Sequence, residues 1–198
     1  MTDLTIIKGS SFSRVLRWES LPLIYKPITA ITKAAPVAIT SATHGLKAGW
    51  RVAVVSAGGM RQINAKNWPL RSADFHKVTV PDPNSVTLND VNSSEYTAYT
   101  SGGYLVSYTP VSLASFTARM QIRSSVDATT TLVSLTSSSG ITLDDTGHTI
   151  TVSIPAADTA AYTWTEGVYD LELASGDVPP IVTKLLSGTI FVVSEVTR

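Results

Sequence analysis

The stretch LTIIKGSSFSRVLRW, residues 4–18, decides the fold, because it begins a strand pattern that the residues after it do not continue. Two short apolar runs flank a Lys-Gly-Ser-Ser turn, a pattern typical of two β-strands joined by a tight connection. Pro22 and Pro27 then stop the pattern, since proline cannot donate to a strand ladder. The alternation resumes only near residue 111, so we predict one β-sandwich whose two halves are separated by an inserted segment.

The stretch FTARMQIR, residues 116–123, resumes the alternation most cleanly. Phe116, Ala118, Met120 and Ile122 fall on one face, as a half-buried strand requires. Further strands are expected at residues 132–135, 140–143, 149–154, 167–173 and 184–193, with a helical turn at 155–161 and a bulge near Leu185, Ser187 and Gly188. A slip of one residue would expose every apolar side chain, so the pattern specifies its own pairing.

The segment between the two halves has a strand rhythm of its own. Short strands are expected at residues 36–40, 50–55, 77–80 and 85–88, separated by glycine-containing turns and by Pro81-Asp82-Pro83-Asn84. A spacing of roughly ten residues favours a small β-barrel-like domain. We predict the sandwich at residues 1–28 and 107–198, and the inserted domain at residues 29–106.

The composition argues for a protein that works in an assembly. Fifteen basic and fifteen acidic residues give a formal net charge of +0, without a basic run, so we expect no nucleic-acid partner. Net neutrality is a solubility liability for a free monomer, and a charged share of only 15% suits a surface that packs against protein. The chain has no cysteine, no signal-peptide pattern and no apolar run long enough for a bilayer, so we expect neither disulfides nor a membrane partner.

No constellation of residues indicates catalysis, a metal or a cofactor. The histidines are scattered beside turns without ligand spacing, at His44, His76 and His148. We interpret Asp144-Asp145 as a hairpin turn rather than a calcium loop, and Asp170 and Glu172 as solvated neighbours on one strand face. The pairs Gly58-Gly59 and Gly102-Gly103 do not join a strand to a helix, as phosphate loops do, and no G-x-S-x-G nucleophile elbow occurs. We therefore expect neither an enzyme nor a bound cofactor.

The aromatic residues give the candidate site residues. Trp50, Trp68 and neighbouring tyrosines are compatible with a carbohydrate platform, although such residues are more often core anchors or interface residues. Trp68 and Tyr99 lie in polar, irregular segments and are predicted to be exposed contacts. Tyr169, two residues after Gly167, is similar to a tyrosine corner, in which a hydroxyl ties a strand to the preceding loop.

The two outer halves resemble the N-terminal immunoglobulin-like (Ig-like) domain of phage baseplate upper proteins. The resemblance is carried by IKGSSF at 7–12, LASFTARMQI at 113–122, IPAADTA at 154–160, GVYDLEL at 167–173 and GTIFVV at 188–193. It implies an all-β fold, an Ig-like β-sandwich interrupted by the inserted barrel-like domain. The insertion itself departs from that family's pattern.

The insert resembles a small β-module common in phage tail proteins and likened to the first catalytic cysteine half-domain of ubiquitin-activating enzymes. Its marks are PVAIT at 36–40, THGL at 43–46, GWRV at 49–52, Gly59-Met60, Asn64, Val86, Leu88 and YTSGG at 99–103. No ubiquitin chemistry is implied, because the chain has no cysteine to carry a thioester.

These resemblances imply a structural component of a tailed-phage virion, assembled in the bacterial host cytoplasm. We expect an adaptor in the tail tip, baseplate or fibre-attachment region, docking to other virion proteins and forming a homo-oligomer in a symmetric ring. Two alternatives remain open: a capsid decoration or head-fibre protein, and a carbohydrate-binding module for host-surface glycans.

Overall fold

The chain folds into two compact units made almost entirely of β-strands. The structure, a computed structural model, describes residues 2–195. One unit, here called the sandwich unit, combines Met1–Glu19 with Pro110–Arg198, and the other, the inserted unit, is Ser20–Thr109. The predicted fold class, an all-β sandwich interrupted by a small barrel-like domain, is confirmed.

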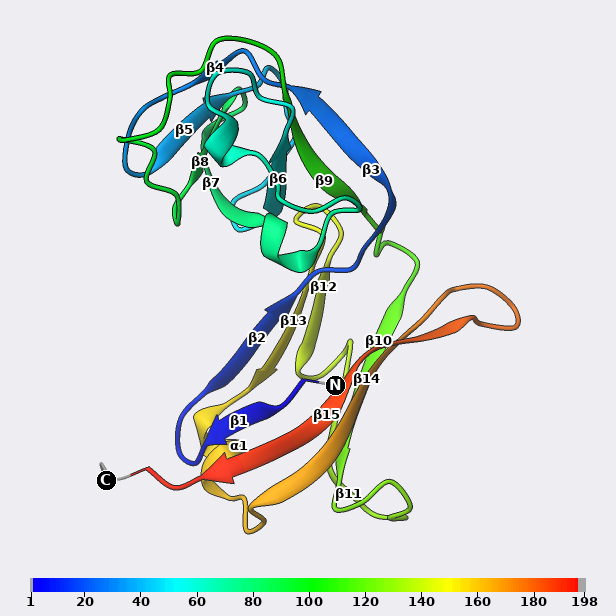
Figure 1. Cartoon of the computed structure of the whole chain (residues 1–198). Helices are drawn as coiled ribbons and strands as arrows, with labels where there is room; N and C mark the ends of the chain where they lie inside the picture. The colour runs from blue at the N-terminus through cyan, green and yellow to red at the C-terminus, as the bar shows by residue number, and fades with distance from the viewer. Residues whose placement is uncertain (1, 196–198) are drawn as a thin grey trace. The chain divides into compact units, whose positions relative to one another are not determined.

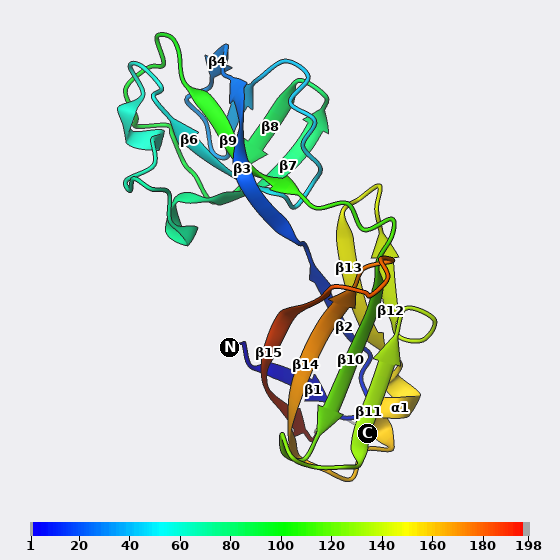
Figure 2. The ribbon, with the colours of Figure 1, turned by 90° about the vertical axis from the view of Figure 1, so that its right-hand side faces the viewer.

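The sandwich unit contains two sheets, and Figure 2 shows the strands of the larger one side by side. The larger sheet has the order β1-β15-β14-β10-β11, and its strands are β1 (Leu4–Ile7), β15 (Val182–Val193), β14 (Glu166–Ala174), β10 (Thr117–Arg123) and β11 (Thr131–Thr136). The smaller sheet has the order β12-β13-β2, with β12 (Ile141–Asp144), β13 (Thr149–Ile154) and β2 (Phe12–Leu16). The predicted helical turn is α1 (Ala156–Ala160).

The N-terminal strands pair with the C-terminal half of the chain, as the sequence predicts (Figure 1). β1 runs parallel to β15, with Leu4 opposite Ile190, and β2 runs antiparallel to β13, with Phe12 opposite Ile154. In order along the chain, β2, β10, β12, β13, β14 and β15 take the positions of strands B, C, D, E, F and G of an immunoglobulin sandwich. The inserted unit therefore replaces the connection between strands B and C.

Alternating burial on the central strands builds the core of the sandwich unit. Met120 and Ile122 on β10, and Leu171 and Leu173 on β14, are at most 2% exposed. Each contributes about 1.5–3 kcal/mol through removal of its side chain from water. The pairing of β14 with β15 shifts register because Leu171 faces Leu186 while Glu172 faces Lys184, so Leu185 is the extra residue of the predicted bulge.

The inserted unit is a curled seven-stranded sheet. Its order is β3-β9-β6-β7-β8-β5-β4, with β3 (Glu19–Pro27), β9 (Tyr104–Pro110), β6 (Arg51–Val55), β7 (His76–Asp82), β8 (Ser85–Leu88), β5 (Val37–Thr40) and β4 (Ala30–Ile31). Two short 3-10 helices, η1 (Arg61–Ile63) and η2 (Ser72–Asp74), lie between β6 and β7.

One stretch of chain closes this sheet into a barrel. The strands at the two ends of the order, β3 and β4, are consecutive in sequence and only two residues apart. Between them Ile28 donates its N–H to Gly103 at 3.0 Å, and Thr29 donates to Thr40 at 2.9 Å, so the segment joins the β9 side to the β5 side. Closure in this way removes exposed sheet edges.

The predicted stop at Pro22 and Pro27 is wrong. Both prolines lie in β3, which is an end strand of its sheet, where a missing N–H costs no ladder hydrogen bond. Because β3 pairs with β9, the boundaries of the units fall after Glu19 and Thr109 instead of after residues 28 and 106.

Candidate functional site

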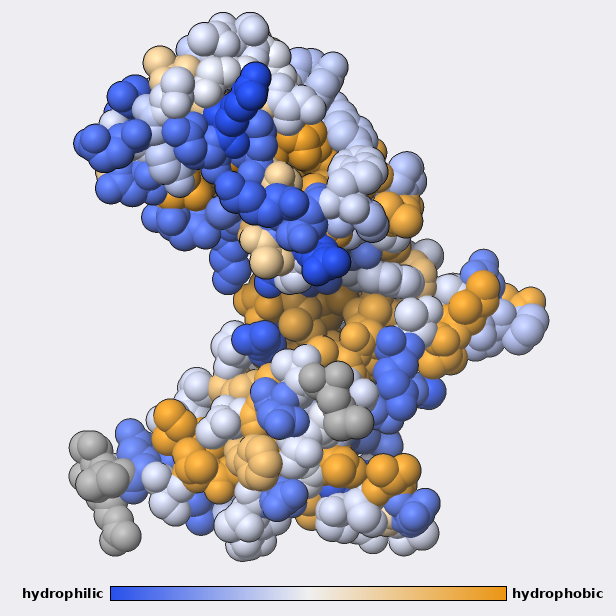
Figure 3. Space-filling view, in the orientation of Figure 1, coloured by the Kyte–Doolittle hydropathy of each residue, from blue (hydrophilic) through white to orange (hydrophobic). Residues whose placement is uncertain are grey.

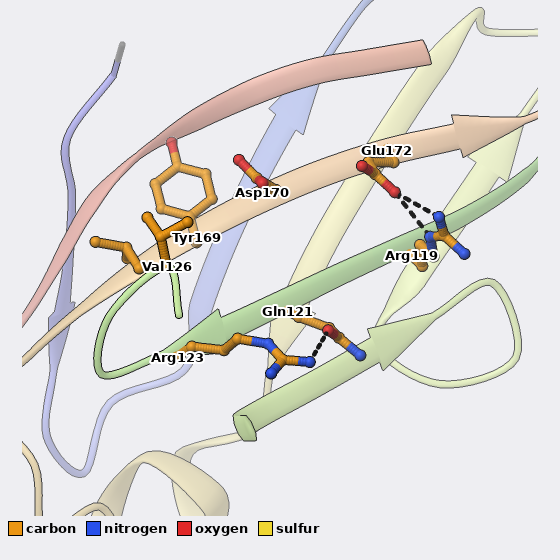
Figure 4. Close-up of a pocket in the computed structure, with 8 residues that line it drawn as sticks. Arg119, Gln121, Arg123, Val126, Tyr169, Asp170 and Glu172 are labelled. Atoms are coloured by element: carbon orange, nitrogen blue, oxygen red, sulfur yellow. Dashed lines mark hydrogen bonds and ion pairs between the residues drawn. The ribbon is translucent and has the colours of Figure 1, made fainter. Parts of the chain in front are cut away.

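A shallow groove of about 410 Å³ lies on the outer face of the five-stranded sheet (Figure 4). Its lining comes from β10, from β14 and from the turn after β10, and comprises Arg119, Gln121, Arg123, Val126, Val168, Tyr169, Asp170 and Glu172. Apart from Tyr169, which is itself a core residue, and Val126 in the turn, these positions alternate with the core residues of the same strands. The period of two that buries one face therefore gathers polar groups on the other.

The charges in this groove neutralise one another. Arg119 pairs with Glu172 at 2.7 Å, and Lys184 from β15 pairs with Asp170 at 2.8 Å. The hydrogen bond that Lys184 donates to the carboxylate of Asp170 raises the pKa of Lys184 above its ordinary value, which keeps the ammonium charged. Arg123 donates to Gln121 at 2.9 Å and also to the carbonyl of Ala128. Asp170 and Glu172 do share one strand face, as predicted, but each is held by a cation, so the groove offers paired charges rather than a free acid or base.

Tyr169 is a buried anchor, although its partner differs from the prediction. Its side chain is 3% exposed, and its hydroxyl donates to the carbonyl of Thr2 at 2.6 Å. A tyrosine corner would reach the loop before its own strand; this hydroxyl instead ties β14 to the segment that leads into β1. Burial raises the pKa of Tyr169, so the hydroxyl remains a donor at neutral pH.

Two glycines allow the close packing around this anchor. A Cβ on Gly188 would lie 2.3 Å from the carbonyl oxygen of Thr2, and a Cβ on Gly167 would lie 2.9 Å from that of Arg123. Neither glycine has a positive φ, so the requirement is space for backbone approach rather than an unusual dihedral angle. The predicted structural residues Gly167 and Tyr169 thus both serve the sandwich core.

The inserted unit presents one tryptophan on a well-ordered loop. Trp68 is 74% exposed, as predicted for a contact residue. The surrounding loop, residues 65–75, is organised by the carboxylate of Asp74, which is only 5% exposed. It accepts from the backbone N–H of Lys66 at 2.9 Å, from that of Arg71 at 2.8 Å, and from the side-chain amide of Asn67 at 3.1 Å.

This arrangement makes the loop a preformed feature. The backbone N–H of Arg71 is the largest influence that holds the pKa of Asp74 below its ordinary value, and the other donors act in the same direction against the opposing effect of burial. A carboxylate that satisfies donors on both sides of Trp68 limits the number of conformations the loop can adopt. The loop therefore loses little entropy when a partner covers it. No signal in the sequence identified Asp74, because an acid in a polar loop looks solvated.

Two aromatic predictions are corrected. Tyr99 is half-buried against the core of the inserted unit, and its hydroxyl donates to the carbonyls of Ile28 and Gly102, both at 3.0 Å. It therefore braces the closing segment of the barrel instead of contacting a partner. Trp50 is 6% exposed and belongs to the same core, so it cannot form a carbohydrate platform with Trp68.

The histidines remain dispersed. His44 is 3% exposed, and its Nδ1 accepts from the backbone N–H of Leu46 at 3.0 Å, which makes it a turn-stabilising residue. His76 lies beside Asp90 at 2.8 Å. Within residues 2–195 no group of three or more His, Cys, Asp or Glu side chains converges as a metal site would require.

The sandwich unit also exposes an apolar hairpin tip. The loop between β14 and β15 carries Val178, 98% exposed, and Ile181, 65% exposed, on either side of two prolines. Figure 3 shows orange residues on this projecting hairpin. In an immunoglobulin sandwich this is the F–G loop, one of the loops used for recognition in variable domains.

No protein-family model matches the sequence, and no curated protein matches it either. In the part of the chain that the structure describes, no helix has the length and apolar character needed to cross a membrane.

Proposed function

We propose that the protein is a structural component of a tailed-phage virion, an adaptor that works by docking to neighbouring subunits in the tail tip, baseplate or fibre-attachment region. The sequence resemblances of both units motivate this proposal. The observation that supports it best is the layout, in which a complete second unit occupies the B–C connection of an immunoglobulin-type sandwich. Such a layout offers two compact units for two sets of contacts.

The chemistry of the surfaces agrees with docking. The groove on the five-stranded sheet carries ion pairs, and the exposed Trp68 lies on a loop that Asp74 organises. Interfaces that assemble proteins concentrate aromatic residues at their centre and surround them with a polar rim. A contact of about 1,600 Å² would suffice for each specific neighbour.

Mass spectrometry of purified virions tests the role, and antibody labelling viewed by electron microscopy tests the position. We expect peptides of this chain in intact particles and label at the tail tip or baseplate. Label on the head would favour the capsid decoration alternative. Absence of the chain from purified particles would refute a virion role altogether.

A glycan-binding function is the second candidate, because Trp68 is so strongly exposed on a preformed loop. A glycan array probed with the full chain tests it. Binding that disappears in Trp68→Ala would support it; an array without signal for the unchanged chain would exclude it.

A further inference from the structure

The chain has no net charge overall, but its two units carry net charges of opposite sign. The inserted unit, residues 20–109, has eight Lys or Arg and four Asp or Glu, a net charge of +4. The sandwich unit has the remaining seven Lys or Arg and eleven Asp or Glu, a net charge of −4. A split of this kind favours association between unlike units and steers their encounter.

The positive charges of the inserted unit have no acidic partners of their own. Among the ion pairs of residues 2–195, none joins a Lys or Arg of the inserted unit to a carboxylate. Asp74 is committed to backbone N–H groups, and Asp90 pairs with His76. Arg51 and Lys77, both exposed, stand directly opposite each other on β6 and β7, and like charges in this position are destabilising. An acidic partner would relieve that repulsion.

The Trp68 loop combines this charge with an apolar anchor. Lys66 lies two residues before Trp68 and Arg71 lies three residues after it, and all three side chains are exposed. Tryptophan and arginine are the residues most enriched at the energetic centres of protein interfaces. We call this surface, made of Lys66, Trp68 and Arg71, the tryptophan surface.

The sandwich unit has a surface of complementary character at its β1 edge. Ile7, Phe191 and Val193 are 47%, 37% and 43% exposed, and the register of β1 with β15 and the alternation of burial put all three on the outer face of the sheet. Glu166 lies opposite Phe191 on β14, and Glu195 follows Val193 by two residues. Figure 3 shows orange residues where Figure 1 draws β1 and the end of β15. We call Ile7, Phe191, Val193, Glu166 and Glu195 the edge surface.

We propose that the tryptophan surface of one copy of this chain docks on the edge surface of a second copy. Trp68 packs on Ile7, Phe191 and Val193, while Lys66 and Arg71 meet Glu166 and Glu195. The two surfaces belong to different units, so the contact is head-to-tail. Repetition of such a contact gives a closed ring when the rotation closes and an open chain when it does not. The inference names the contact of the proposed assembly and to that extent rests on it.

Analytical ultracentrifugation of the full chain tests the contact over a range of protein concentrations. We expect association that strengthens with concentration and weakens at least tenfold when salt rises from about 0.05 M to about 0.5 M, because exposed charges are screened over that range. Trp68→Ala should weaken association at least tenfold. Val15→Ser is the matched control, since Val15 is 59% exposed but lies on β2 in the other sheet.

Charge reversal with rescue makes the test specific. Lys66→Glu with Arg71→Glu should abolish association, and so should Glu166→Lys with Glu195→Lys. All four changes in one chain should restore it to within about threefold of the unchanged protein, a coupling that double-mutant cycles detect. Lys33→Glu with Lys47→Glu, a reversal of two exposed cations outside the tryptophan surface, changes the net charge by the same amount and is the control for net charge.

Three results would overturn the contact. The first is a chain that stays monomeric at every concentration in low salt. The second is association that Trp68→Ala does not weaken. The third is a variant with all four charge reversals that does not regain association. A monomer that binds polyglutamate through Trp68 would identify a different acidic occupant. Each of these results leaves the virion role standing, because that role is measured separately on purified particles.

Discussion

Ile6→Ala tests whether the first strand belongs to the sandwich core. Ile6 is 0% exposed and lies on β1 opposite Val192, within the core cluster of the sandwich unit. Truncation of a buried isoleucine to alanine costs roughly 2–5 kcal/mol, made up of lost transfer energy and a residual cavity. A middle value of about 3 kcal/mol would lower the Tm of a unit of this size by about 10 °C or more.

The neighbouring residue supplies the control. Ile7 has the same side chain on the same strand but is 47% exposed, because successive residues of a strand face opposite ways. Ile7→Ala should cost less than about 1 kcal/mol. Urea unfolding followed by hydrogen exchange and mass spectrometry separates the units, since peptides of residues 20–109 report on the inserted unit alone. Equal effects of the two substitutions, or loss of protection in the inserted unit instead, would refute the assignment of β1.

Three further predictions follow from the anchor, the loop and the insertion. Tyr169→Phe removes the hydrogen bond to Thr2 and leaves its partly buried carbonyl without this donor, so we expect the free energy of unfolding in urea to fall by about 1–2 kcal/mol. An unchanged midpoint would contradict the anchoring role. The pKa of Asp74 is lower in the folded protein than in the unfolded chain, where it is about 3.9. The ionised carboxylate therefore contributes its full stabilisation at pH values above the unfolded-state pKa, and this contribution is lost as the pH falls through the folded-state pKa. NMR of the Arg71 N–H should show a transition in that acid range which disappears in Asp74→Asn. Joining Glu19 to Pro110 through a short Gly-Ser linker should leave a sandwich that folds cooperatively by circular dichroism, and failure to fold would show that the inserted unit is required for it.

The sequence was sufficient for the pairing of its distant ends because strand periodicity is a local signal with a long-range consequence. Residues such as Ile6, Met120 and Leu171 must be buried on one face, and their alternation also fixes the register. The bulge at Leu185 was predictable for the same reason, since the alternation is interrupted there.

What the sequence missed depends on contacts between residues that are not neighbours in an alternating pattern. Whether proline ends a strand depends on which partner the strand has, and β3 keeps Pro22 because it is an end strand. The roles of Tyr99 and Asp74 depend on carbonyls and N–H groups that converge only after the barrel and its loop have formed. A local pattern cannot reveal such convergence.

The position of the insertion has a simple thermodynamic justification. Val111 donates its N–H to the carbonyl of Trp18 at 2.9 Å, so the sandwich unit holds its two open ends side by side. The inserted unit does the same, because Thr109 donates its hydroxyl to the carbonyl of Pro22 at 2.6 Å. Lengthening a flexible connection from about 6 residues to about 90 would cost roughly 2.4 kcal/mol in closure entropy, at about 0.6 kcal/mol for each doubling. A folded insert that keeps its own ends together costs less than this. The sandwich can therefore carry a complete second unit without giving up the core contacts that join the two halves of its sequence.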